Sequence, residues 1–121
     1  MIPEQERRQF IRLGMRLNVT YKIIGTGKIG TALTTNFSGA GLRFLAEHAL
    51  AAGTQLDVTL RLPERAEPIK CQGEVVWSEP RRSPDSALPG DTSEVGVRFV
   101  QIDPKDRTLI VQCAALYGPP L

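Results

Sequence analysis

Two short polar stretches contain most of the side chains to which a chemical role can be assigned. The first, ERRQFIR at residues 6–12, places Arg7, Arg8 and Arg12 within six positions of the N-terminal region. On a helix, Arg8 and Arg12 would lie one turn apart and repel each other, which does not favour an ordinary surface helix. The stretch is therefore either a solvated terminal arm or a cationic segment that binds an anion.

The second stretch, NFSGAG at residues 36–41, lies between two β segments. The Asn36 amide offers donors and an acceptor, and the Ser38 hydroxyl can act as either. Gly39 and Gly41 allow backbone N–H groups to approach a ligand closely. Because Asn, Ser and Gly are also the commonest turn residues, this stretch taken alone predicts a tight turn.

The other reactive residues favour neither catalysis nor metal binding. The single histidine, His48, stands in LAEHALAAG, which has the pattern of a surface helical turn. A Ser-His-Asp triad or a metal cluster would depend on that residue alone, so we expect no enzyme and no cofactor. Cys71 and Cys113 lie in apolar patterns, which predict buried free thiols in place of a disulfide.

Length and composition are those of one ordinary globular domain. The chain has 121 residues, of which 41% are hydrophobic and 23% charged. A chain of this length and composition can bury a hydrophobic core without disulfides or a structural metal ion. A net charge of +2 and an aromatic content of 6% do not favour a DNA or RNA binder. The sequence contains no apolar run of membrane-span length, and MIPEQERRQF lacks the apolar core of a signal peptide, so we expect a cytoplasmic protein.

Alternating apolar residues predict six strands. Five of them cover residues 16–23, 29–35, 42–45, 54–62 and 95–102. The remaining strand lies in IKCQGEVVWSEP, where Ile69, Cys71, Val75 and Trp77 share a parity and Gly73 marks a bulge or a close approach.

The connections and the C-terminal segment complete the pattern. Residues 25–28 predict a hairpin turn, residues 46–53 a short helical turn closed by Gly53, and residues 80–94 a mobile loop. Asp103 is a candidate N-cap, followed by Pro104 at the first helical position and an acid in the first turn. The apolar positions of this helix are Leu109, Ile110, Cys113, Leu116 and Tyr117.

These elements predict a mainly β fold. Six short strands without long helices between them, followed by one amphipathic helix, indicate a closed or nearly closed antiparallel barrel with the helix packed against it. We expect residues 16–118 to form the barrel and helix, and residues 1–15 to form a flexible arm of the same domain that carries the arginines.

The two polar stretches, in this order and on these elements, resemble the PilZ domain family. Arg8 and Arg12 match its R-x-x-x-R element, and Asn36, Ser38 and Gly41 match its D/N-x-S-x-x-G element, in which Asn is a permitted variant. GLRF, GEVVWSEP and VGVRFV look like the strand sequences that follow in the family. The resemblance runs to the final helix and implies the six-stranded split β-barrel of PilZ type.

The resemblance also implies binding of cyclic di-GMP, a bacterial second messenger. A guanidinium can donate to guanine O6 and N7, pair with phosphate and stack on a purine, whereas lysine cannot do all three. We assign Arg8 and Arg12 to guanine edges and phosphates, and Asn36 and Ser38 to a guanine edge and a nearby phosphate or ribose. The two glycines of the second stretch would allow close backbone approach.

Two further residues are candidates for the same site. In similar proteins an arginine at the position of Arg7 accompanies an intercalated pair of ligand molecules; the alternative is a solvated terminal charge. One or two ligands per domain therefore remain open. The parity of Trp77 with Val75 favours core packing, although a tryptophan near a strand end can stack on a base, as in some relatives.

The expected mechanism is closure of the arm. It has little apolar area, so we expect Arg8 and Arg12 to become ordered over a ligand on the NFSGAG surface and to carry Phe10 and Ile11 with them. A partner protein would bind the changed surface and thereby control motility, biofilm formation or polysaccharide export. The alternative is a PilZ-type adaptor that binds a protein and no nucleotide.

Overall fold

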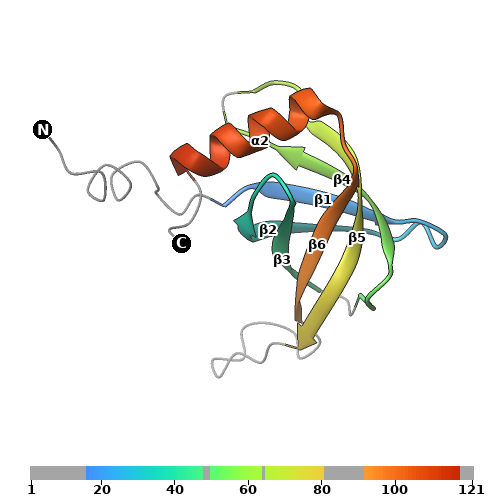
Figure 1. Ribbon diagram of the computed structural model, residues 1–121. Coiled ribbons are helices and arrows are strands. Elements are labelled where there is room, and N and C mark those ends of the chain that lie inside the picture. Colours follow the sequence, from blue (N-terminus) through green and yellow to red (C-terminus); the bar gives the residue numbers. More distant parts are fainter. Residues whose placement is uncertain (1–15, 48–49, 64, 81–91, 118–121) are drawn as a thin grey trace, which may run out of the picture.

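The fold is a closed six-stranded barrel with one helix packed against it (Figure 1). The computed structural model describes residues 16–47, 50–63, 65–80 and 92–117. Its strands are β1 (Asn18–Ile23), β2 (Ile29–Phe37), β3 (Gly41–Ala46), β4 (Gln55–Arg61), β5 (Ile69–Pro80) and β6 (Ser93–Gln101), followed by helix α2 (Pro104–Tyr117). The predicted mainly β barrel with a C-terminal helix is confirmed.

Every strand pairs antiparallel with two neighbours, in the order β1-β2-β3-β6-β5-β4. On β1, Thr20 lies opposite Thr31 of β2 and Thr59 of β4. The contact between β1 and β4 closes the circle, so no strand of the barrel presents a free edge for aggregation.

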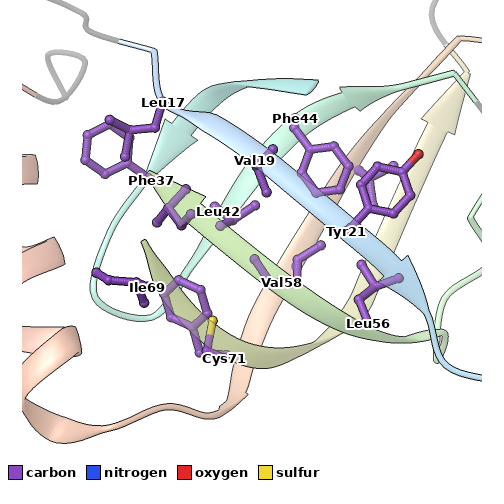
Figure 2. Close-up of a cluster of buried hydrophobic side chains, with 14 of the residues drawn as sticks. Leu17, Val19, Tyr21, Phe37, Leu42, Phe44, Leu56, Val58, Ile69 and Cys71 are labelled. Atoms are coloured by element: carbon purple, nitrogen blue, oxygen red, sulfur yellow. The ribbon is translucent and has the colours of Figure 1, made fainter. Parts of the chain in front are cut away.

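The core is built from the inward side chains of all six strands and from α2. Figure 2 shows part of this cluster, with labelled side chains that come from β1 to β5 and from Leu17 just before β1. The rings of Tyr21 and Phe44 stack with their centroids 5.2 Å apart. Ile110 of α2 is fully buried against the same cluster. Burial of this continuous apolar surface is the main term that stabilises the barrel.

Helix α2 begins as predicted. The Asp103 carboxylate accepts a hydrogen bond from the Lys105 N–H at 2.8 Å, which satisfies one of the unpaired amides of the first turn. Its buried face contains Ile110 and Cys113, whereas Leu116, predicted to be buried, is 47% exposed. In the part of the chain that the structure describes, no helix has the length and apolar character needed to cross a bilayer.

A second departure from prediction, in the segment between β3 and β4, concerns the expected helical turn. The expected helical turn over residues 46–53 is wrong for the residues described there, which form a bend at Glu47 and a turn at Ala52 and Gly53. Gly53 has a φ of 93°, a conformation that glycine adopts without strain, so it can close this turn.

The chain enters the barrel through a buried polar contact. Thr34 of β2 is completely buried, and its hydroxyl oxygen accepts a hydrogen bond from the Leu17 N–H at 2.8 Å. The Thr34 N–H in turn donates to the Leu17 carbonyl at 2.9 Å. The start of β1 is thereby fixed beside β2, next to the polar stretch that ends β2.

We predict that Thr34→Val destabilises the protein by about 1–3 kcal/mol, because the buried Leu17 N–H then loses its acceptor. Urea denaturation measures the loss. Thr34→Ser is the matched control, since it keeps the hydroxyl and should retain most of the stability. Equal urea midpoints for Thr34→Val and the wild type would contradict a stabilising role of the hydrogen bond between Thr34 and Leu17.

Both cysteines are buried and free, as predicted. Burial, and secondarily the nearby Asp106 carboxylate, raises the pKa of the Cys71 thiol from 9.0 to about 11. Burial also raises the pKa of Cys113.

The folded protein therefore retains the Cys71 proton to higher pH than the unfolded chain does. We predict that ionisation of Cys71 does not change the free energy of unfolding below pH 9.0. As the pH rises from 9.0 toward about 11, the thiol ionises in the unfolded chain but not in the folded protein, so the free energy of unfolding falls. Denaturation midpoints across this range should fall less steeply in Cys71→Val than in the wild type. Parallel curves would show that the thiol does not titrate in this way.

Candidate functional site

The NFSGAG stretch is divided between two strands and the turn that joins them. Asn36 lies in β2, Gly41 begins β3, and residues 38–40 form the turn. The Ser38 N–H donates to the Gly41 carbonyl at 2.8 Å, and the Ala40 N–H donates to the Ser38 hydroxyl oxygen at 3.2 Å. Asn36 accepts from the Phe37 N–H at 2.8 Å, and its amide N–H groups have no acceptor among the described residues.

The two glycines of this stretch are required by packing. A Cβ on Gly41 would collide with the Val97 carbonyl oxygen of β6, and one on Gly39 would lie 2.6 Å from Val111 Cγ2 of α2. The turn is therefore pressed against both β6 and the helix, which explains the glycines without a ligand. Their predicted role in ligand approach stays a prediction.

An irregularity in β2 sets the direction of Asn36. Thr34 pairs with Phe44 and is buried, but the register shifts before Asn36 pairs with Arg43 on the outer surface. Thr35 is the extra residue of this β-bulge, and its hydroxyl donates to a Glu94 carboxylate oxygen at 2.9 Å. Strict alternation from buried Thr34 would point the Asn36 side chain inward, and the bulge turns it to the outer surface instead.

A second bulge places Trp77 on the same surface. Val75 pairs with Val97, but the next pair is Trp77 with Gly96, which leaves Val76 as the extra residue. Core packing of Trp77, which its parity with Val75 favoured, is therefore wrong: the side chain is half-buried on the outer face. The indole lies over Gly96, where a Cβ would collide with it.

The two bulges create one row of residues across four neighbouring strands. The row runs from Asn36 (β2) through Arg43 (β3) and Gly96 (β6) to Trp77 (β5), each residue paired with the next. The Arg43 guanidinium carbon lies 5.7 Å from the centroid of the Trp77 ring, within cation–π range. We call this set the polar row.

An open cavity of about 220 Å³ lies along the polar row. Ser38 and Arg98 line it beside Asn36, Arg43 and Trp77, and the described lining residues include no acid. Arg98 donates from Nε and Nη2 to one oxygen of Glu74, at 2.8 and 2.6 Å. The cavity thus offers a flat aromatic surface, amide and hydroxyl groups and two guanidinium groups, a combination suited to a planar base attached to a phosphate.

The structure brings together four of the residues predicted from sequence, namely Asn36, Ser38, Gly41 and Trp77, with Gly39 in the adjoining turn. Arg7, Arg8 and Arg12 lie outside the described residues, as does His48. Within the described ranges, no three His, Cys, Asp or Glu side chains gather closely enough to hold a metal ion.

Sequence reasoning missed Arg43 and Arg98. Their outward direction was readable from strand parity, because buried Leu42, Phe44, Val97 and Phe99 flank them. That the two arginines share one cavity follows only from the pairing of β3 with β6, which the sequence does not reveal.

Two solved structures are similar to this one in fold. The Bacillus subtilis inhibitor of motility, MotI/DgrA, has a TM-score of 0.63 and 21% identity over 93% of this chain and 54% of its own. The chain thus spans about half the length of MotI. The PilZ domain of YcgR from Escherichia coli, solved with c-di-GMP, has a TM-score of 0.62 and 13% identity over 83% of this chain and 81% of its own.

Sequence comparison identifies the family. No curated protein is similar enough in sequence to count as a match. The model of the PilZ domain, however, matches residues 6–116, which include both polar stretches, all six strands and most of α2. The chain therefore belongs to the PilZ domain family.

Proposed function

We propose that this domain is a receptor for cyclic di-GMP. The observation that carries the proposal is the polar row, which places Asn36, Arg43 and Trp77 along one cavity on the barrel of a PilZ family member. Support comes from the similar PilZ domain of YcgR, whose structure was solved with c-di-GMP.

In this proposal each group of the cavity takes a part of the ligand for which its chemistry is suited. One guanine stacks on the exposed side of the Trp77 indole. The free amide of Asn36 and the Ser38 hydroxyl bind the guanine edge and a nearby phosphate or ribose. Arg43 and Arg98 pair with phosphate oxygens at the rim.

The cavity is too small to enclose the whole ligand. At about 220 Å³ it is below the roughly 300–1,000 Å³ of sites that enclose a drug-sized molecule. The N-terminal arm completes the site: Arg8 and Arg12 bind guanine edges and phosphates from the outer side, and Arg7 allows a second, intercalated ligand molecule.

The arm starts at the right place for this role. Leu17 is hydrogen-bonded to Thr34, and Thr34 lies two positions before Asn36 on β2. An extended chain spans at most about 3.6 Å per residue, so the Cα atoms of Arg12 and Arg8 can lie up to about 14 and 29 Å from that of Arg16. Both arginines can therefore reach the cavity.

Signal output in this proposal passes through a protein partner. Arm closure changes the surface around the cavity, and a partner recognises the closed form. Control of motility, biofilm or polysaccharide is the proposed context, and the fold neighbour MotI is named as an inhibitor of motility. Binding of a protein without any nucleotide is the competing function.

Calorimetric titration with cyclic di-GMP tests the receptor function, with GTP and linear pGpG as ligand controls. We predict selective binding that Arg8→Ala weakens by about 1–3 kcal/mol, roughly fivefold to over a hundredfold, and Ser38→Ala by about 1 kcal/mol. The matched control is Arg61→Ala, an exposed arginine of β4, a strand that contributes no residue to the cavity. Absence of binding at high ligand concentration would contradict the proposal and favour the adaptor without nucleotide.

Trp77 is the only tryptophan, so its fluorescence reports directly on the cavity. We predict that cyclic di-GMP quenches this fluorescence, because a base stacks on the indole. Trp77→Ala should weaken binding by about 1–3 kcal/mol, and Trp77→Phe, which keeps a smaller ring, by less. Unchanged fluorescence at saturation, together with full affinity of Trp77→Ala, would exclude stacking on this residue.

A further inference from the structure

Arg98 at the cavity is paired with an anion that belongs to the protein itself. Its Nε and Nη2 groups both donate to Oε1 of Glu74, at 2.8 and 2.6 Å. Glu74 lies on β5 and does not line the cavity. The guanidinium of a cavity arginine is therefore held by a carboxylate from outside the cavity.

A register shift between β5 and β6 creates this pair. Gly73 pairs with Phe99, whereas the residue before Gly73 pairs with Gln101, so one residue of β6 is extra. Uninterrupted pairing from Gln101 would place Glu74 opposite Phe99, which is buried; the extra residue places it opposite Arg98 on the outer face. The shift confirms the irregularity that the sequence predicted at Gly73.

Arg98 has this acid on one side and the cavity on the other. Its strand, β6, lies between β3 and β5 (Figure 1). The partner of Arg98 on β5 is Glu74, and its partner on β3 is Gly41, which lines the cavity and contributes no side chain. Adjacent strands lie about 4.8 Å apart, a distance that a long arginine side chain spans in either direction. The guanidinium can thus pair either with Glu74 or with an anion in the cavity.

Glu74 is the fixed member of the pair and Arg98 the mobile one. Gln55 of β4 lies opposite Glu74, and its Nε2 donates to the second carboxylate oxygen at 3.1 Å. The Glu74 side chain is 24% exposed, whereas that of Arg98 is 59% exposed. An exchange of anions on Arg98 therefore requires movement of the exposed guanidinium and leaves the carboxylate in place.

We propose that Glu74 lowers the affinity of the cavity for cyclic di-GMP by competing with a ligand phosphate for Arg98. In the proposed function, on which this inference rests, Arg98 pairs with a phosphate oxygen. Carboxylate and phosphate oxygens accept the same charge-assisted hydrogen bonds from a guanidinium, so one can replace the other. Ligand binding then includes loss of the pair with Glu74. Glu74 thereby determines affinity without touching the ligand.

Asp57 provides the matched control. It is an exposed acid of β4 that accepts a hydrogen bond from Gln72 Nε2 at 3.4 Å, and it does not line the cavity. Asp57→Asn removes one negative charge from the outer face of the barrel, as Glu74→Gln does, but breaks no contact with Arg98. A general effect of net charge on an anionic ligand would appear in both variants.

A double-mutant cycle in the full chain tests the competition, with cyclic di-GMP affinity measured by calorimetry at one ionic strength. We expect Glu74→Gln to tighten binding roughly two- to fivefold, as the strength of an exposed ion pair allows. Arg98→Ala should weaken binding roughly three- to tenfold, and in its presence Glu74→Gln should have no effect. Asp57→Asn should leave the affinity unchanged. Urea midpoints show whether the variants fold.

The outcomes separate the competition from the function on which it rests. A wild-type protein that does not bind cyclic di-GMP overturns both. If the wild type binds, unchanged or weaker binding by Glu74→Gln overturns the competition and leaves the receptor function intact. Equal tightening without Arg98, or by Asp57→Asn, also overturns it, because the effect is then one of net charge. Tighter binding that requires Arg98 supports it, since a purely structural role of Glu74 would lower the urea midpoint without raising the affinity.

Discussion

A strand that gains one residue against its partner changes the face on which the following side chains lie, and the candidate site depends on this constraint. The bulge at Thr35 turns Asn36 outward, and the bulge at Val76 does the same for Trp77. Closure of the barrel then fixes β3 and β6 between these strands, so Arg43 lies between Asn36 and Trp77 in one row. Without either bulge, the amide or the indole would point toward the core.

The packed interior holds this row in place. Gly96 leaves room for the indole, and Gly41 allows β3 to approach the backbone of β6 more closely than any side chain would permit. The core beneath, with the stacked rings of Tyr21 and Phe44, resists rearrangement because side chains at native density have few alternative positions. The cavity is thus already formed in the protein alone, and binding of a ligand there would not have to offset the cost of forming it.

The charged groups at the rim differ in how firmly they are held. Arg98 pairs with Glu74, but its side chain is 59% exposed, and exposed ion pairs contribute only about 0–1 kcal/mol. Exchange of that carboxylate for another anion would therefore cost little. Arg43 lies against the Trp77 ring, which orients its guanidinium at the cavity without an acidic partner among the described residues. Both arginines are thus available to an anion.

Local patterns in the sequence determined the strands, the Asp103 cap of α2 and the family of the chain, because alternation, capping and motif spacing are properties of neighbouring residues. Only the tertiary structure decided that Trp77 lies outside the core and that Arg43 and Arg98 share its cavity. It also decided that Leu116 remains exposed. The physical reason is that a bulge and a shared cavity are relations between strands paired across the barrel, and no single segment of the sequence contains both members of such a pair.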